Sequence, residues 1–313
     1  MSHLSLPDDV LADLELAAKH SLAMRTWSSY KTAERSLILY CKEEGIRFQL
    51  PVTEKVLAGF VHWLGFRRSK KAATINNYLA GIRKLHILKG LPAPTLRTDF
   101  IQMVLMGKKN MEDAARLRDG SNERQPVTTD ILQLIKARLR SWEAPGRDKC
   151  TIWTICTLLF HGAFRGGELL CRSKYEFDPA FTLLRQDMVL VQDTSCKNTS
   201  MLQVKVKAPK ERKDNRAVIV DVYQSDTEIC PIRAYKKWYA ATASNQPDQP
   251  AFRLDDGVPV TATTLNRILP ERLTGYLDNQ RITAHSFRGG GCLHDGQSGL
   301  VGYGRKSCRQ MEQ

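Results

Sequence analysis

The chain has 313 residues, of which 42% are apolar and 26% charged, and this length is enough for two domains that each bury a core of their own. Its 47 Lys and Arg residues outnumber 33 Asp and Glu, and the net charge of +14 favours a polyanion such as nucleic acid as a partner, although a merely basic protein remains an alternative. No run approaches the ~18 apolar residues of a membrane span, and the eight cysteines form no CxxC pair, which argues against a zinc site and a disulfide framework and favours a reducing, intracellular compartment.

A helical domain is predicted over residues 21–107, after an N-terminal extension (1–20) that lacks the pattern of a secretory signal. Apolar residues recur three and four positions apart, which is the spacing of a helix with one buried face. Four helices with short connections predict a compact bundle. They are expected at Thr26–Glu44, Thr53–Leu64, Ala72–Leu88 and Leu96–Met106.

Residues 108–126 are polar and charged, contain Gly120 and end at Pro126, and we interpret them as an interdomain linker. The second domain, 127–313, mixes helical and strand-like patterns, which predicts an α+β domain with a small antiparallel sheet in a mainly α protein. Its helices are expected at 128–142, 149–161, 230–241 and 261–276, the last interrupted at Pro270, and its strands at 188–192, 201–207 and 216–222.

Three segments of this domain carry residues suited to phosphodiester chemistry: HGAFRGGELL (161–170), VKAPKERKDNRAVIV (206–220) and AHSFRGGG (284–291). Arg165 and Arg288 can bind the non-bridging oxygens of a phosphate through their guanidinium forks. Lys207, on a hairpin turn, can donate a proton to a leaving oxygen, and His285 can accept or relay the proton of a nucleophile.

Each of these signals has an ordinary structural explanation when it is taken alone. Arg165 could be a surface residue at the end of a buried helix, and Lys207 could belong to a solvated basic hairpin. His285 and Arg288 lie on one face if a helix begins there, and structural pairs of that kind are common. Their order and spacing together favour the functional interpretation.

The three segments in this order resemble the tyrosine recombinase (phage integrase) superfamily, over about residues 20–291. The first box of that family, Gly-[aromatic or Leu]-Arg-x-x-Glu, is matched by Gly162, Phe164, Arg165 and Glu168, with Ala163 as an extra residue. The second box is a hairpin lysine, matched by Lys207, and the third is His-x-x-Arg, matched by His285 and Arg288. The phrases ERQPVTTDIL (123–132), FDPAF (177–181) and ICPIRAYKKW (229–238) are similar to recombinases of eukaryotic mobile elements, of the tyrosine-recombinase retrotransposon or Crypton type.

The resemblance implies a core-binding helical bundle and a catalytic domain that clamp double-stranded DNA, mostly through phosphates. It implies strand cleavage by a tyrosine, through a 3′-phosphotyrosyl bond that needs no nucleotide, small-molecule cofactor or obligatory metal. A homo-oligomer on DNA, no membrane partner, and nuclear residence in a eukaryotic host are further expectations.

Beyond Arg288 the pattern of the family stops. The family places a His or Trp and then its tyrosine nucleophile further along, whereas residues after 291 are Gly-rich and polar. Tyr303, only 15 residues past Arg288 and flanked by glycines, is a weak candidate nucleophile. We therefore expect a truncated or frame-shifted end and no completed strand cleavage. The alternatives are a non-catalytic DNA-binding protein, domesticated or relic, and a helical regulatory or scaffold protein.

Overall fold

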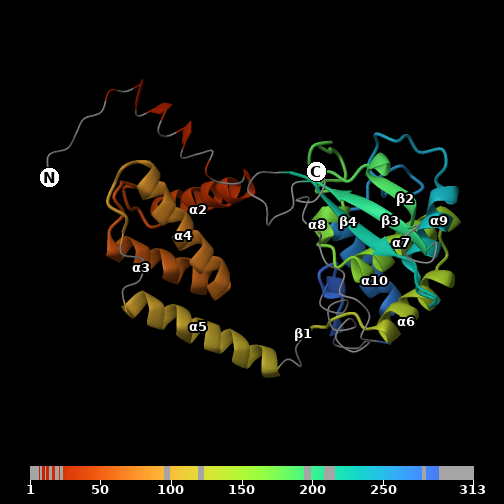
Figure 1. The fold of residues 1–313 in the computed structure, drawn as a ribbon. Coiled ribbons are helices and arrows are strands. Elements are labelled where there is room, and N and C mark those ends of the chain that lie inside the picture. The colour runs from red at the N-terminus through yellow and green to blue at the C-terminus, as the bar shows by residue number, and fades with distance from the viewer. Residues whose placement is uncertain are drawn as a thin grey trace. The chain divides into compact units, whose positions relative to one another are not determined.

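The structure, a computed structural model, describes residues 24–94, 99–118, 123–193, 199–207, 216–276 and 280–288, with scattered positions before residue 24. The chain forms two compact units, Met1–Gly120 and Ser121–Gln313 (Figure 1). In the part of the chain that is described, no helix has the length and apolar character needed to cross a membrane.

The first unit is a helical bundle whose α2 and α4 pack against each other (Figure 1). Thr53 caps α3 by accepting a hydrogen bond from Val56 N, as expected for a Thr that precedes a helix. The side chains of Tyr40, Phe60 and Trp63 pack together in its core. Its elements are α2 (Met24–Glu43), α3 (Glu54–His62), the π-helical turn η1 (Trp63–Arg67), α4 (Ala72–Leu88) and α5 (Asp99–Arg118).

Helix α5 continues to Arg118, so the segment 108–118, which the sequence analysis assigned to a linker, is helical. Two contacts explain the extension. Lys108 and Glu112 form an ion pair one helical turn apart, at 3.3 Å, and Glu112 also accepts a hydrogen bond from Ala72 N at 3.0 Å. The charged residues therefore continue the helix and tie it to the start of α4.

The second unit is built around α7 (Gly146–His161), whose residues from Ile152 to Phe160 are nearly all buried. Helices α6 (Thr129–Arg140) and α9 (Pro231–Ala241) pack against it. Helix α10 (Ala262–Leu273) continues through Pro270, so the predicted interruption is wrong. Leu269 and Leu273 are both buried, and their packing outweighs the one backbone hydrogen bond that the proline removes.

The sheet of this unit is antiparallel in the order β2 (Met188–Asp193), β3 (Thr199–Val206), β4 (Val218–Tyr223). Val206 pairs with Val218, so β3 and β4 are antiparallel neighbours up to the end of β3. A second, parallel pair joins β1 (Glu123–Arg124) to β5 (Gln280–Arg281). The expected fold class, mainly helical with an α+β domain that carries a small antiparallel sheet, is confirmed.

Candidate functional site

Arg165 stands at a sharp turn between the buried helix α7 and the short helix α8 (Gly166–Leu169). The turn depends on Gly162, because a Cβ there would lie 2.1 Å from the ring of the buried Phe164. Ala163, the extra residue relative to the family pattern, adopts a left-handed backbone conformation with φ +46°. The insertion is therefore absorbed within the turn, and Arg165 still occupies the N-cap of α8.

Glu168 holds Arg165 at two points. Its Oε2 accepts a hydrogen bond from Arg165 N at 2.8 Å, and its Oε1 accepts one from Arg165 Nη1 at 3.1 Å. The Glu168 side chain is 6% exposed, whereas that of Arg165 is 28% exposed. A buried carboxylate thus orients a guanidinium that still reaches the surface, which is the arrangement required to present a fixed cation to an anionic ligand.

His285 and Arg288 lie on a segment that is anchored by its neighbours. Thr283 N donates to Ser286 Oγ at 3.2 Å, Ala284 N donates to Asn266 Oδ1 at 2.8 Å, and Val127 N donates to Ser286 O at 3.0 Å. Thr283, Ala284 and Ser286 are buried, whereas the His285 side chain is exposed and Arg288 is partly exposed. The segment therefore has a buried base and places its imidazole at the surface.

The structure brings the first and third sequence segments together. A Cβ built on Gly166 would lie 3.0 Å from the Cβ of Ala284, so the two backbones approach as closely as a glycine allows. Arg165 and His285 are the immediate neighbours of these residues. The exposed imidazole and the oriented guanidinium consequently arise from two segments in contact.

Lys207 follows directly after β3 and has local partners. Its Nζ lies 2.6 Å from Asp187 Oδ2 and donates a hydrogen bond to Pro179 O at 3.0 Å. Asp187 ends the 3₁₀ helix η2 (Arg185–Asp187). The lysine is thus held against residues that precede the sheet. Tyr303, the weak candidate nucleophile, lies outside the described residues.

Two residues of this region were missed by sequence reasoning. Asp187 stands three residues after Leu184, whose backbone N–H its carboxylate accepts at 2.8 Å, a capping pattern readable in principle from the sequence. Asn266 bonds to Ala284 N across 18 residues, and no local signal could have indicated that contact.

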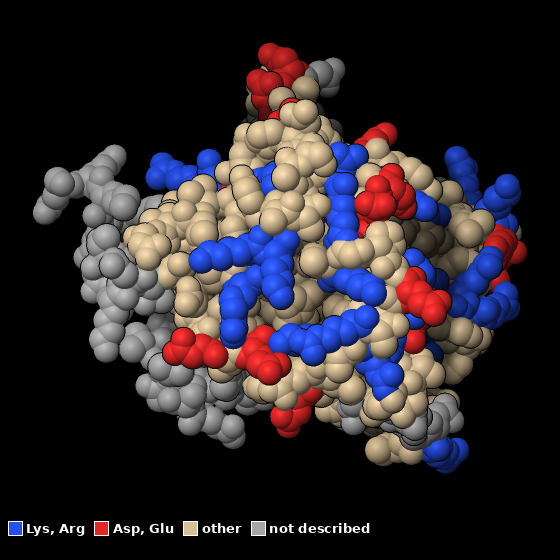
Figure 2. All heavy atoms as spheres, turned by 90° about the vertical axis from the view of Figure 1, so that its right-hand side faces the viewer, with Lys and Arg blue, Asp and Glu red and all other residues tan. Residues whose placement is uncertain are grey.

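Basic residues also line the solvent side of the second unit. Helix α9 buries Tyr235 and Trp238 but exposes Arg233, Lys236 and Lys237. Figure 2, which looks onto the molecule from the side where α9 lies, shows Lys and Arg side chains over the middle of this face, with Asp and Glu around them. The excess of positive charge is thus visible on the folded surface.

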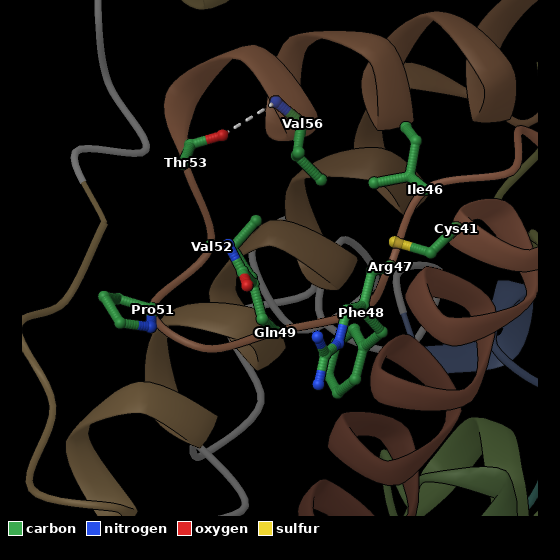
Figure 3. A pocket seen from close by; sticks show the side chains of 9 residues that line it. All are labelled: Cys41, Ile46, Arg47, Phe48, Gln49, Pro51, Val52, Thr53 and Val56. Atoms are coloured by element: carbon green, nitrogen blue, oxygen red, sulfur yellow. Dashed lines mark hydrogen bonds between the residues drawn. The ribbon is translucent and has the colours of Figure 1, made fainter.

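No metal centre competes with this site in the described part of the chain. No group of three or more His, Cys, Asp or Glu side chains gathers there in a way that could hold a metal ion. A cavity of about 80 Å³ lies in the first unit, between α2 and the start of α3 (Figure 3). It is far below the several hundred Å³ of typical ligand sites. Its lining consists of Cys41, Ile46, Arg47, Phe48, Gln49, Pro51, Val52, Thr53 and Val56.

Solved structures are the known proteins to which the chain can be compared. Neither a family profile nor a curated protein sequence matches the chain. Among solved structures, it is similar to the XerH site-specific recombinase bound to palindromic difH substrate, with 14% identity over 91% of this chain and 74% of that chain and a TM-score of 0.53. It is also similar to the Tn1549 transposon integrase in complex with transposon right end DNA, with 12% identity over 93% and 87% of the two chains and a TM-score of 0.53. The chain therefore has the fold of the tyrosine recombinases.

Proposed function

We propose that this chain binds double-stranded DNA as a tyrosine recombinase-like protein of site-specific recombination and integration. The observation that carries the proposal is the contact between Gly166 and Ala284, which places the Arg165 turn beside the His285 segment. This contact supports the assignment of three side chains of the family pattern, those of Arg165, His285 and Arg288, to one site. A scissile phosphate is the ligand that these groups fit best.

Each residue would have a distinct part in this site. Arg165, held by Glu168, and Arg288 would bind the non-bridging phosphate oxygens and neutralise the charge that develops on them. The exposed imidazole of His285 can accept the proton of an attacking hydroxyl. Lys207, on its hairpin, is the candidate proton donor to the leaving 5′ oxygen.

The proposal includes the finer expectations from the sequence. The similarity of 123–132, 177–181 and 229–238 to recombinases of eukaryotic mobile elements supports an origin in such an element. The XerH neighbour is bound to a palindromic DNA site. Because a palindrome presents the same half-site twice, we include assembly of a homo-oligomer on DNA.

The proposal also holds that the chain, with the sequence printed here, binds without completing strand cleavage. Tyr303 is its only tyrosine after Arg288, and Gly302 and Gly304 flank it. A nucleophile needs a hydroxyl held at a fixed position beside the phosphate. The alternative within the same fold is a domesticated or relic protein that occupies a DNA site.

DNA binding tests the first part. Affinity for a duplex of about 30 base pairs, measured by fluorescence anisotropy at several salt concentrations, should fall steeply as salt rises. Arg165→Ala and Arg288→Ala should each make the negative slope of log K against log salt shallower by roughly 0.9, the value of one phosphate contact. Arg267→Ala, an exposed arginine of α10 paired with Glu271, is the matched control and should leave the slope unchanged. No binding at low salt would contradict the proposal.

A nicked suicide substrate tests the second part. Cleavage of such a substrate traps the phosphotyrosyl bond, because the short cleaved fragment diffuses away and rejoining fails. We expect no protein–DNA band that survives SDS. A surviving band that disappears in Tyr303→Phe would show that Tyr303 is a working nucleophile and would overturn this part alone.

A further inference from the structure

The ion pair between Lys207 and Asp187 is largely protected from water. Their side chains are 15% and 7% exposed, and Nζ and Oδ2 are 2.6 Å apart. The pair between Arg267 and Glu271, in contrast, lies at the surface with side chains 63% and 44% exposed. A buried pair of opposite charges at this distance is close to neutral as a unit, and breaking it leaves a charge without its partner.

Asp187 is fixed in its position, whereas Lys207 stands at the end of a strand. The Asp187 carboxylate accepts Leu184 N at 2.8 Å, and its own backbone N–H donates to Leu184 O at 3.0 Å. The adjacent Arg185 donates to Thr242 Oγ1 and to Tyr239 O, so its guanidinium is directed away from Asp187. Lys207 is therefore the cation that compensates the buried Asp187 carboxylate.

We infer that Asp187 competes with DNA for Lys207: the lysine reaches a phosphate only when it leaves this carboxylate. The inference rests on the proposed function, because it concerns the hairpin lysine of that same site. Two of the three N–H groups of Lys207 point to Asp187 and Pro179. An approaching phosphate would meet the negative charge of Asp187 next to the ammonium. As long as the pair is intact, Lys207 adds less to the salt-dependent binding of duplex DNA than it does after it leaves Asp187.

Removal of the competing charge tests the inference on the full chain. Asp187→Asn keeps an oxygen that can accept Leu184 N but removes the negative charge that holds Lys207. With a 30-base-pair duplex as the probe, the slope of log K against log salt should become steeper by roughly 0.9, and affinity at 0.1 M salt should rise by about tenfold. Lys207→Ala should reduce the steepness of the slope less in the otherwise unchanged chain than in the Asp187→Asn variant. The double variant, Asp187→Asn with Lys207→Ala, should return to the slope of the unsubstituted chain.

Asp221 provides the matched control. It lies on β4 of the same sheet, and its Oδ1 accepts a hydrogen bond from Gln203 Nε2 at 3.3 Å, which an asparagine oxygen can also accept. Asp221→Asn changes the net charge by the same amount as Asp187→Asn but does not touch Lys207. We expect it to leave the slope unchanged.

Three results would overturn the inference. Lys207→Ala could lower the slope by about 0.9 in the otherwise unchanged chain, which would mean that the lysine already contacts DNA beside Asp187. The slope measured for Asp187→Asn could equal that of Asp221→Asn. The steeper slope of Asp187→Asn could also persist in the double variant. If Asp187→Asn does not fold, as judged by circular dichroism, Lys207→Ala alone decides. Absence of DNA binding by the unsubstituted chain would instead remove the proposed function itself, and this is observed before any substitution is made.

Discussion

The carboxylate of Glu168 accepts hydrogen bonds from both the backbone N–H and the guanidinium of Arg165. One buried side chain thus caps helix α8 and orients the arginine at its start. The two tasks are separable by substitution, since the backbone bond requires only an acceptor and the guanidinium bond benefits from a charge.

Replacement of Glu168 should therefore have graded effects. Glu168→Ala leaves Arg165 N without this acceptor, and we expect a loss of about 1–3 kcal/mol in the free energy of unfolding. Glu168→Gln keeps an acceptor and should cost less, while it still weakens DNA binding through a less fixed Arg165. Urea denaturation and anisotropy on the same samples measure both effects. Equal stability of the Ala and Gln variants would contradict the capping role.

The contact between Gly166 and Ala284 predicts a rescue. A methyl group on Gly166 meets Ala284 Cβ at 3.0 Å, so Gly166→Ala should destabilise the second unit by about 1–3 kcal/mol and displace the His285 segment. Gly166→Ala combined with Ala284→Gly should recover most of that loss. Gly167→Ala is the control, because nothing lies within 4 Å of its Cβ. Failure of the rescue, measured by thermal unfolding, would show that the contact is not the cause.

Arg185 should be a stabilising residue of the second unit rather than a ligand of DNA. It is buried, bonds to Thr242 Oγ1 at 2.5 Å, and lies 5.1 and 4.1 Å from the ring centres of Trp238 and Tyr239. Arg185→Ala should lower the free energy of unfolding by about 2–4 kcal/mol. The salt slope of DNA binding, measured on the fraction that remains folded, should not change. A change of that slope would place Arg185 in the interface.

Alkaline pH should destabilise the second unit through Tyr235. Burial of the phenol, with a smaller effect of Tyr239, raises the pKa of Tyr235 from 10.0 to about 12 in the folded chain. The buried neutral phenol contributes fully to the free energy of unfolding below pH 10. This contribution is lost as pH rises from 10 to 12, because Tyr235 ionises first in the unfolded chain. Stability measured from pH 9 to 12 should decline more steeply in the unsubstituted chain than in Tyr235→Phe. Tyr235→Phe has a lower starting value, since it lacks the hydrogen bond to Met188 O.

Residues close in sequence were predictable where one periodic pattern decides the structure. The strands at 188–192, 201–207 and 216–222 and the helix at 230–241 follow from alternation and helical spacing, and they are close to β2, β3, β4 and α9. The predicted interruption at Pro270 and the predicted end of the fourth helix at Met106 were wrong because tertiary contacts override local preference. Leu269 and Leu273 hold α10 together, and Glu112 holds α5 to Ala72.

The candidate site residues stay a prediction from recognisable segments, and the sequence did not indicate most of their partners. Arg165, Glu168 and His285 occur in recognisable segments, and Glu168 lies three residues from the arginine that it binds. The contact of Gly166 with Ala284 and the pair of Lys207 with Asp187 join positions 118 and 20 residues apart, respectively. Such contacts depend on the packed domain, and a single sequence carries no local signal for them.

The short parallel pairing of β1 with β5, together with the bond from Val127 N to Ser286 O, has a mechanical consequence. Residues 123–127, near the start of the second unit, are joined through their backbone to the segment that carries His285. A displacement of Glu123 or Arg124 is therefore transmitted first to the backbone near His285. A fragment that starts after residue 127 would lack this pairing and this hydrogen bond. A fragment made to study the second unit alone should therefore start before Glu123.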